Sequence, residues 1–360
     1  MKIHVKSSIL RHIPVQHGGK KSKKISDSQI IDFSSNVTPV GIPPSIRKFL
    51  KKNLSDVENY PDSSSSALIS SLKQFTGLGK KNLLVGNGAI EIIYNFCFSF
   101  LSNKTKVLIP VPTFQEYETA SSLNNSKILF FKTLDLSENI DSFVSKIPKN
   151  GCVFICNPNN PTGKLLSKNH IISIVKKAKK LSTIVFVDEC FIELVPESNE
   201  SVISYVKKFD NLFVLRSLTK SFGIPGIRIG YAAASKSMIE ILQKIKIPWS
   251  VNTIAQDVGL VALKNKKHLI ESNKIIKNEY QFLKNKIANF RGVTCYDSFT
   301  NFILIKTKCD STKLQQKLLK HKILVRDCKN FHGLNNHYIR IAVKSHKDNL
   351  KLVNALEKVL

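Results

Sequence analysis

Acidic residues are scarce in this chain of 360 residues, where 26 Asp and Glu stand against 55 Lys and Arg, a formal net charge of +29. A strongly basic chain binds nucleic acid when its charges form a patch or stripe on one face. Here the lysines come in pairs on expected helix faces, such as Lys51-Lys52 and Lys176-Lys177, without Arg clusters or interleaved aromatics. We therefore interpret the charge as a solvated surface and expect no nucleic-acid partner. A basic, non-catalytic binding module is the disfavoured alternative, and an anionic substrate is compatible with the charge.

Long apolar runs are also missing. The longest, 89–101, carries Glu91 and is shorter than the roughly 18 residues of a membrane span, so it predicts a buried helix and no membrane partner. The first residues lack the apolar segment of a secretory signal. The seven cysteines include no C-x-x-C pair, which argues against a disulfide scaffold or a zinc site. We expect a cytoplasmic protein with reduced thiols and no metal.

The chain contains no internal repeats; instead, short β-branched runs alternate with amphipathic helical patterns such as 168–180. The runs cover 82–88, 106–111, 127–131, 152–157, 183–189 and 211–217. Continuous apolar strands separated by helices predict an α/β fold with a mostly parallel, doubly wound sheet. Ligands bind beyond the carboxyl ends of such strands, where several polar motifs fall.

The pattern changes after Pro248. A long helical region is predicted from Thr253 to Asn289, followed by strand-like runs at 293–296, 301–307, 323–328 and 337–343 and a final helix from His346. This succession predicts a small α+β C-terminal domain over 248–360, beside a large domain over 36–247. Residues 1–35 are predicted to form an N-terminal arm that joins the small domain.

A glycine-rich turn and a proline-rich turn each follow a predicted strand. The run 86–91 contains Gly88 and opens a helix, an arrangement that suits phosphate binding at a helix N-terminus but equally suits a plain turn. The run 157–163 places Asn160 between prolines, where its amide is either held for a ligand oxygen or part of a rigid turn.

Three charged residues stand out against the many surface lysines. Asp188 ends an apolar strand, and a buried carboxylate is costly unless a cation or protonated nitrogen pairs with it; a helix cap or a structural ion pair is the alternative. Lys220 lies among small and hydroxyl residues, and a desolvated lysine beside other cations is a nucleophile that bonds to aldehydes. Arg228, eight residues on, has the guanidinium fork that holds phosphate.

Together these features suit the cofactor pyridoxal 5'-phosphate. The order and spacing of Asn160, Asp188 and Lys220 resemble those of the aspartate aminotransferase superfamily, pyridoxal-phosphate enzymes of fold type I, and the resemblance extends over nearly the whole chain. It implies a large domain with a mostly parallel sheet and a smaller C-terminal α+β domain. The matching cofactor-binding positions are Gly88, Ala89, Phe114, Asn160, Asp188, Ser217, Lys220, Arg228 and Tyr60.

The resemblance also implies roles. Lys220 would bond covalently to the cofactor and shuttle protons, and Asp188 would pair with the ring nitrogen; these are the expected catalytic residues. Phe114 would stack on the ring. Tyr60 would reach the cofactor phosphate of a neighbouring subunit, which implies a homodimer. Arg340 would hold the substrate carboxylate.

Within the superfamily, the chain resembles the branch of histidinol-phosphate aminotransferases and L-threonine O-3-phosphate decarboxylases of cobalamin biosynthesis. The runs 17–19, 32–41, 248–252 and 325–334 favour the decarboxylases, as does Phe191 in place of the tyrosine found in many relatives. This implies decarboxylation of a small phosphorylated amino acid, with an aminotransferase as the alternative. The implied substrate contacts are His17, Gly18, Asn36, Asn160, Arg326 and Arg340. The sequence departs from the family at Lys20, where an asparagine is usual.

Overall fold

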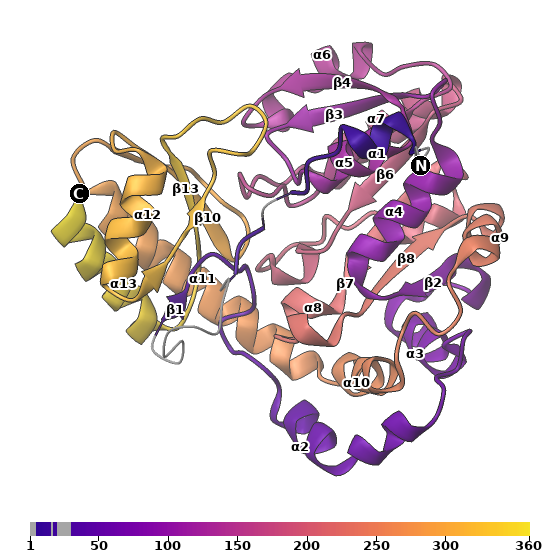
Figure 1. The fold of residues 1–360 in the computed structure, drawn as a ribbon, viewed down its shortest axis with the longest axis horizontal. Helices are drawn as coiled ribbons and strands as arrows, with labels where there is room; N and C mark the ends of the chain where they lie inside the picture. Colours follow the sequence, from indigo (N-terminus) through magenta and orange to yellow (C-terminus); the bar gives the residue numbers. More distant parts are fainter. Residues whose placement is uncertain (1–4, 16, 20–29) are drawn as a thin grey trace, which may run out of the picture.

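The computed structural model describes residues 5–15, 17–19 and 30–360 (Figure 1). Its central element is a seven-stranded sheet with the order β2-β8-β7-β6-β5-β3-β4. The strands are β2 (Leu83–Gly86), β3 (Lys106–Val111), β4 (Lys127–Lys132), β5 (Cys152–Cys156), β6 (Ile184–Asp188), β7 (Leu212–Ser217) and β8 (Gly230–Ala234). β8 runs antiparallel to both of its neighbours, and the remaining pairs are parallel.

Helices cover both faces of this sheet because its strands are apolar on both sides. Along β5, Val153 and Ile155 face one core and Phe154 faces the other, as the two-residue period of a strand requires. The first core includes α2 (Pro44–Lys52), α3 (Ser66–Thr76), α6 (Ile140–Ser145), α7 (Lys168–Lys180) and α10 (Thr253–Leu263). The second includes α4 (Gly88–Phe100), α5 (Glu116–Leu123) and α9 (Lys236–Ile245).

The C-terminal part forms a four-stranded antiparallel sheet with the order β12-β13-β10-β9. These strands are β9 (Val293–Cys295), β10 (Phe302–Thr307), β12 (Arg326–Asp327) and β13 (Tyr338–Ala342), and helices α11 (Lys266–Ala288), α12 (Ser311–Lys320) and α13 (His346–Val359) pack beside them. In the arm, α1 (Ser7–Leu10) is a single turn. β1 (Ile31–Asp32) pairs with β11 (Ile323–Leu324) and so lies on the C-terminal part of the chain.

The predicted fold class, the six predicted strands of the large sheet and the buried helix after Gly88 are confirmed. The sequence did not predict β8, because Gly230–Ala234 is mostly alanine and has little β-propensity. The long helical region is interrupted at Lys264 and Asn265 and forms two helices, α10 and α11. The run 323–328 forms two strands that belong to different sheets.

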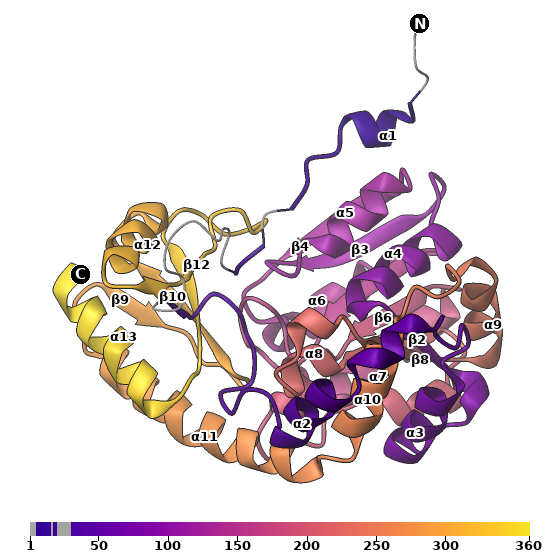
Figure 2. The ribbon, with the colours of Figure 1, turned by 60° about the horizontal axis from the view of Figure 1, so that its bottom comes forward.

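The division into domains stays a prediction. Val251, Ala255 and Val258 lie in a core of the large sheet, although they follow the predicted boundary at 248. Helix α11 contributes Ile276 to the other core of the large sheet and Leu283 to the core of the four-stranded sheet. It therefore connects the two parts of the molecule (Figure 2).

In the part of the chain that the structure describes, no helix has the length and apolar character needed to cross a bilayer.

Candidate active site

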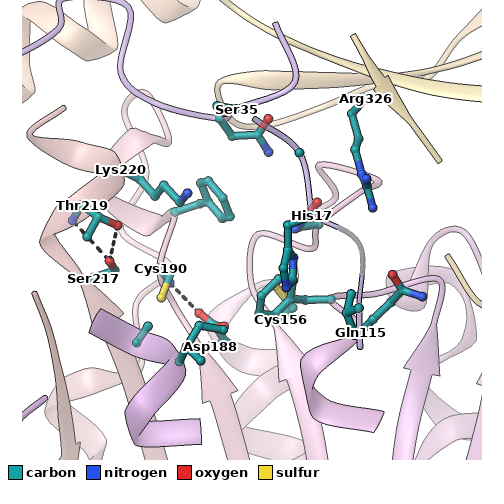
Figure 3. A pocket seen from close by; sticks show the side chains of 18 of the residues that line it. His17, Ser35, Gln115, Cys156, Asp188, Cys190, Ser217, Thr219, Lys220 and Arg326 are labelled. Carbon is teal, nitrogen blue, oxygen red and sulfur yellow. Dashed lines mark hydrogen bonds between the residues drawn. The ribbon is translucent and has the colours of Figure 1, made fainter. Parts of the chain in front are cut away.

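A cavity of about 310 Å³ lies beyond the carboxyl ends of the parallel strands (Figure 3). Its walls come from the large sheet, from the four-stranded sheet and from the arm. The predicted site residues that line it are His17, Gly18, Asn36, Ala89, Phe114, Asn160, Asp188, Ser217, Lys220, Arg228, Arg326 and Arg340. The fold therefore brings together residues that lie more than 300 positions apart in the chain, such as His17 and Arg340.

Lys220 lies in the single helical turn α8 (Leu218–Ser221), directly after β7, and its side chain points into the cavity (Figure 3). Ser217 begins the turn, since its hydroxyl accepts a hydrogen bond from the Thr219 amide at 3.2 Å. Burial lowers the pKa of the Lys220 amine, and the positive charges of Arg340 and Arg228 lower it further. A lysine with a lowered pKa is a competent nucleophile and proton carrier.

Asp188 ends β6, and its side chain is almost fully buried, with 5% of the residue exposed. Burial raises the pKa of this carboxyl. Two hydrogen bonds oppose that effect: the Tyr117 hydroxyl donates to Oδ2 at 2.6 Å, and the Cys190 amide donates to Oδ1 at 2.9 Å. The next helical turn (Ile192–Leu194) has Phe191 as its N-cap residue, so Asp188 does not cap it, and the carboxyl group of Asp188 lies at the edge of the cavity.

At the turn that contains Gly88, the Arg228 guanidinium lies so close to the backbone that there is no room for a side chain. Gly88 has φ +76°, and a Cβ there would collide with the Arg228 guanidinium. A Cβ on Gly230 would lie 2.7 Å from the Ala89 amide nitrogen. The start of the thirteen-residue helix α4, its free amides and Arg228 thus face one small space, which is the arrangement that binds a phosphate.

Arg340 is held from two sides. Nη1 donates to Asn160 Oδ1, and Nη2 donates to the Ser34 carbonyl at 2.7 Å. Its guanidinium lies over the Phe302 ring, and burial lowers the pKa of Arg340 to about 10. Within the described residues, Nε of Arg340 and Oδ1 of Asn36 are buried without a hydrogen-bond partner. Buried polar atoms of this kind are usually paired, so both suit a bound ligand.

Arg326 reaches the cavity from β12 (Figure 3). Nη2 donates to Asn330 Oδ1 at 3.0 Å, and the Asn330 amide donates to Gln115 Oε1 at 3.1 Å. A chain of polar contacts therefore joins the four-stranded sheet to the loop before α5. Burial lowers the pKa of Arg326 as well.

The arm enters the cavity at His17. Nε2 of His17 donates to Glu116 Oε1 at 2.6 Å, and the Tyr94 hydroxyl donates to Oε2 of the same carboxylate at 2.7 Å. The ring of His17 lies 5.9 Å from that of Phe114. There is no room for a side chain at Gly18, since a Cβ would lie 2.7 Å from the Ser34 carbonyl oxygen. Lys20, the departure from the family pattern, lies outside the described residues.

Two predicted site residues, Gly88 and Tyr60, are not among those that line the cavity; Gly88 directly precedes the lining residue Ala89, whereas Tyr60 lies on the surface. It is 83% exposed, and its ring packs on that of Trp249 at 4.9 Å. This position agrees with a role toward a second subunit, which stays a prediction.

Phe191, the departure from the usual tyrosine, lines the cavity and packs edge-on against Phe302 at 5.1 Å.

The sequence analysis missed several neighbours of the site. Gln115, Glu116 and Tyr117 directly follow the predicted Phe114, and Asn330 lies in the highlighted run 325–334, so proximity in sequence was an available signal. The pairs His17–Glu116, Tyr117–Asp188 and Gln115–Asn330, by contrast, join residues that are 71 to 215 positions apart, and no local pattern indicates such a pairing.

The residues present fit pyridoxal phosphate. A glycine turn with Arg228 suits its phosphate, the buried Asp188 suits its ring nitrogen, and the desolvated Lys220 amine suits its aldehyde. Fold and site thus define a pyridoxal-phosphate enzyme of fold type I. The family model for aminotransferases of class I and II matches residues 28–358, so the chain belongs to that family, and its cofactor is pyridoxal phosphate.

Comparisons with individual proteins point to two activities. The chain is 37% identical over 356 residues to a protein of Caldanaerobacter subterraneus subsp. tengcongensis that is provisionally named a threonine-phosphate decarboxylase, covering 95% of this chain and 93% of that one. It is 34% identical over 333 residues to a histidinol-phosphate aminotransferase of Thermoanaerobacter pseudethanolicus, covering 91% and 92%. The crystal structure of L-threonine-O-3-phosphate decarboxylase from Porphyromonas gingivalis superposes with a TM-score of 0.83 at 25% identity, covering 91% and 98%.

Proposed function

We propose that this protein decarboxylates L-threonine O-3-phosphate to (R)-1-aminopropan-2-yl phosphate and carbon dioxide. The observation that carries the proposal is a pair of buried arginines. Arg326 and Arg340 are directly opposite each other on the neighbouring strands β12 and β13, and both line the cavity. Two guanidinium groups that line one cavity from directly opposite positions suit a ligand with more than one anionic group.

The proposed substrate has two anionic groups that suit this pair. Threonine phosphate carries a carboxylate and a phosphate, and arginine binds both in a bidentate manner. His17 and Gln115 add polar groups on the same side of the cavity. The similarity to threonine-phosphate decarboxylases supports the same substrate.

The roles of the residues follow from their positions. When bound, pyridoxal phosphate supplies an electron sink for a bond at the substrate α-carbon that stands perpendicular to the ring. Asp188 would keep the ring nitrogen protonated, and Asn160 would hold the ring oxygen. Arg340 would orient the carboxylate for cleavage. Lys220 would carry the proton that the α-carbon takes up after carbon dioxide has left, because its lowered pKa makes the ammonium form a ready donor.

The second candidate is a histidinol-phosphate aminotransferase, favoured by the relative of Thermoanaerobacter pseudethanolicus. Histidinol phosphate has a phosphate but no carboxylate, so one arginine of the pair would face no anion until the keto acid enters. The decarboxylase reaction uses both arginines with a single substrate.

The two candidates separate in one assay. The purified holoenzyme is incubated with carboxyl-labelled threonine phosphate and without any keto acid, and we expect labelled carbon dioxide and the amino alcohol phosphate. A parallel reaction contains histidinol phosphate and 2-oxoglutarate. Glutamate formation there, with no carbon dioxide from threonine phosphate, would overturn the proposal in favour of the aminotransferase.

The proposal includes a homodimer in which Tyr60 completes the site of the second subunit. Tyr60, Val57, Ile247 and Trp249 are between 52% and 83% exposed, and Tyr60 packs on Trp249, so these apolar side chains are accessible to a second subunit. We expect sedimentation measurements to give a dimer. The variant Tyr60→Phe should bind the cofactor more weakly and should still be a dimer. A monomeric holoenzyme with full activity would contradict this part.

A further inference from the structure

Tyr117 lies beside the carboxylate of Asp188. It belongs to the first turn of α5 and is fully buried. Its ring stacks on Phe154 at 5.0 Å with an interplanar angle of 12° and meets Phe114 edge-on at 5.6 Å. Aromatic contacts on two sides therefore fix the ring, and the direction of its hydroxyl is fixed with it.

The hydroxyl has one strong partner. It donates to Asp188 Oδ2 at 2.6 Å, a short distance typical of a hydrogen bond to a charged acceptor. The Cys190 amide donates to the other oxygen at 2.9 Å. Because each oxygen of a carboxylate accepts about two hydrogen bonds, capacity remains on the side of Asp188 that lines the cavity.

We propose that Tyr117 is a positioning residue for Asp188, which sets both the orientation of the carboxylate toward the cofactor ring nitrogen and the stability of its charged form. No residue role at position 117 is implied by the family resemblance described above. The inference rests on the role proposed for Asp188 but not on the identity of the substrate.

The physical reason is the dry environment of the carboxylate. Burial favours the neutral carboxylic acid and raises the pKa of Asp188, whereas a donated hydrogen bond favours the anion. Tyr117 is suited to this task because burial and the Asp188 charge raise its own pKa well above the ordinary value, so it stays a neutral donor. A neutral aspartic acid would no longer keep the ring nitrogen protonated.

The test uses Tyr117→Phe, which removes the hydroxyl and keeps the ring stacked on Phe154. The measured quantity is the ¹⁵N chemical shift of ring-labelled pyridoxal phosphate in the holoenzyme, followed against pH, together with the dissociation constant of the cofactor. We expect the ring nitrogen to lose its proton at a lower pH than in the wild type. The cofactor should bind roughly ten- to a hundred-fold more weakly, the effect of losing a hydrogen bond to a buried charge.

Tyr94→Phe is the matched control. Tyr94 also donates to a buried carboxylate, that of Glu116, at 2.7 Å, so the two variants remove the same kind of bond. The control should leave the ¹⁵N titration unchanged. If both variants shift the titration equally, or if neither does, the inference is wrong.

A double-mutant cycle separates this inference from the role of Asp188 itself. In an Asp188→Asn background, Tyr117→Phe should cause no further change in the cofactor dissociation constant, and additive effects would contradict the positioning role. If Asp188→Asn alone leaves the ring-nitrogen titration unchanged, the assignment of Asp188 fails. If Asp188→Asn shifts the titration and Tyr117→Phe does not, the positioning role of Tyr117 is excluded, while the assignment of Asp188 stands. All of these readouts are independent of the threonine phosphate assay.

Discussion

The wall of the cavity below Lys220 and the wall that carries the two arginines are built from different kinds of structure. The first takes Asp188 and Ser217 from the ends of adjacent parallel strands, and Lys220 from the turn that follows. The second takes Arg326 and Arg340 from paired antiparallel strands and His17 from the arm. The first wall holds groups that suit the cofactor, and the second holds groups that suit anions of a substrate.

The walls also differ in how their charges are balanced. On the first wall, Asp188 receives two hydrogen bonds, and the pKa of Lys220 is lowered by burial and by neighbouring cations. Arg326 and Arg340 face each other with like charge. Because these arginines suit anions of a substrate, the preference for substrate should be altered on the second wall with the least damage to the cofactor site.

The largest expected effect is that of Lys220→Ala, on the first wall. Removal of the amine should lower turnover by at least about 10³-fold, since proton transfer by a positioned side chain alone contributes roughly 10²–10⁴-fold. Borohydride treatment of the wild-type holoenzyme, followed by peptide mapping, should place the reduced cofactor label on position 220. A label on another lysine would contradict the assignment.

Asp188→Ala should come next. Without a carboxylate the ring nitrogen is not held protonated, so turnover should fall on the order of 10²-fold or more, the size typical of one lost electrostatic contact in a reaction site. Visible absorbance of the purified variant should show that the cofactor is still bound. Near-normal turnover would mean that another group protonates the nitrogen.

Arg340→Ala tests the second wall, and it should change KM, whereas the two variants of the first wall should change turnover. Truncating one partner of a buried charge contact costs about 2–5 kcal/mol, so KM for threonine phosphate should rise roughly thirty-fold or more. The cofactor should remain bound, as visible absorbance will report. A colourless protein would place Arg340 in the cofactor site and remove the distinction between the two walls.

The smallest expected effect is on how the thermal stability of the apo-protein depends on pH. Because the folded pKa of Lys220 is below its unfolded value of about 10.5, the unfolded chain binds more protons between these two values, and stability rises with pH across that window. Lys220→Met should therefore raise the thermal midpoint near neutral pH, and the difference should shrink as pH approaches 10.5. Equal midpoints at every pH would show that the amine is not desolvated.

Local sequence was sufficient for much of the first wall. The ends of predicted strands placed Asp188, Ser217 and Asn160 at one edge, because parallel strands separated by helices have their carboxyl ends on the same side. The glycine turn of the phosphate site was indicated by the run 86–91, and Arg228 by its position eight residues after Lys220. The residues of the second wall were indicated by family resemblance alone, since nothing in the local pattern joins position 17 to position 340.

The sequence by itself determined the alternation of strands and helices, the parallel sheet and the lysine, carboxylate and glycine motifs at its edge, since these depend on periodicity and on residues close in the chain. Only the tertiary structure decided that β8 inserts between β2 and β7, that Glu116 joins His17 and that Tyr117 reaches Asp188. Such contacts are set by packing among elements distant in sequence, where shape and burial select the partner and no local signal is required.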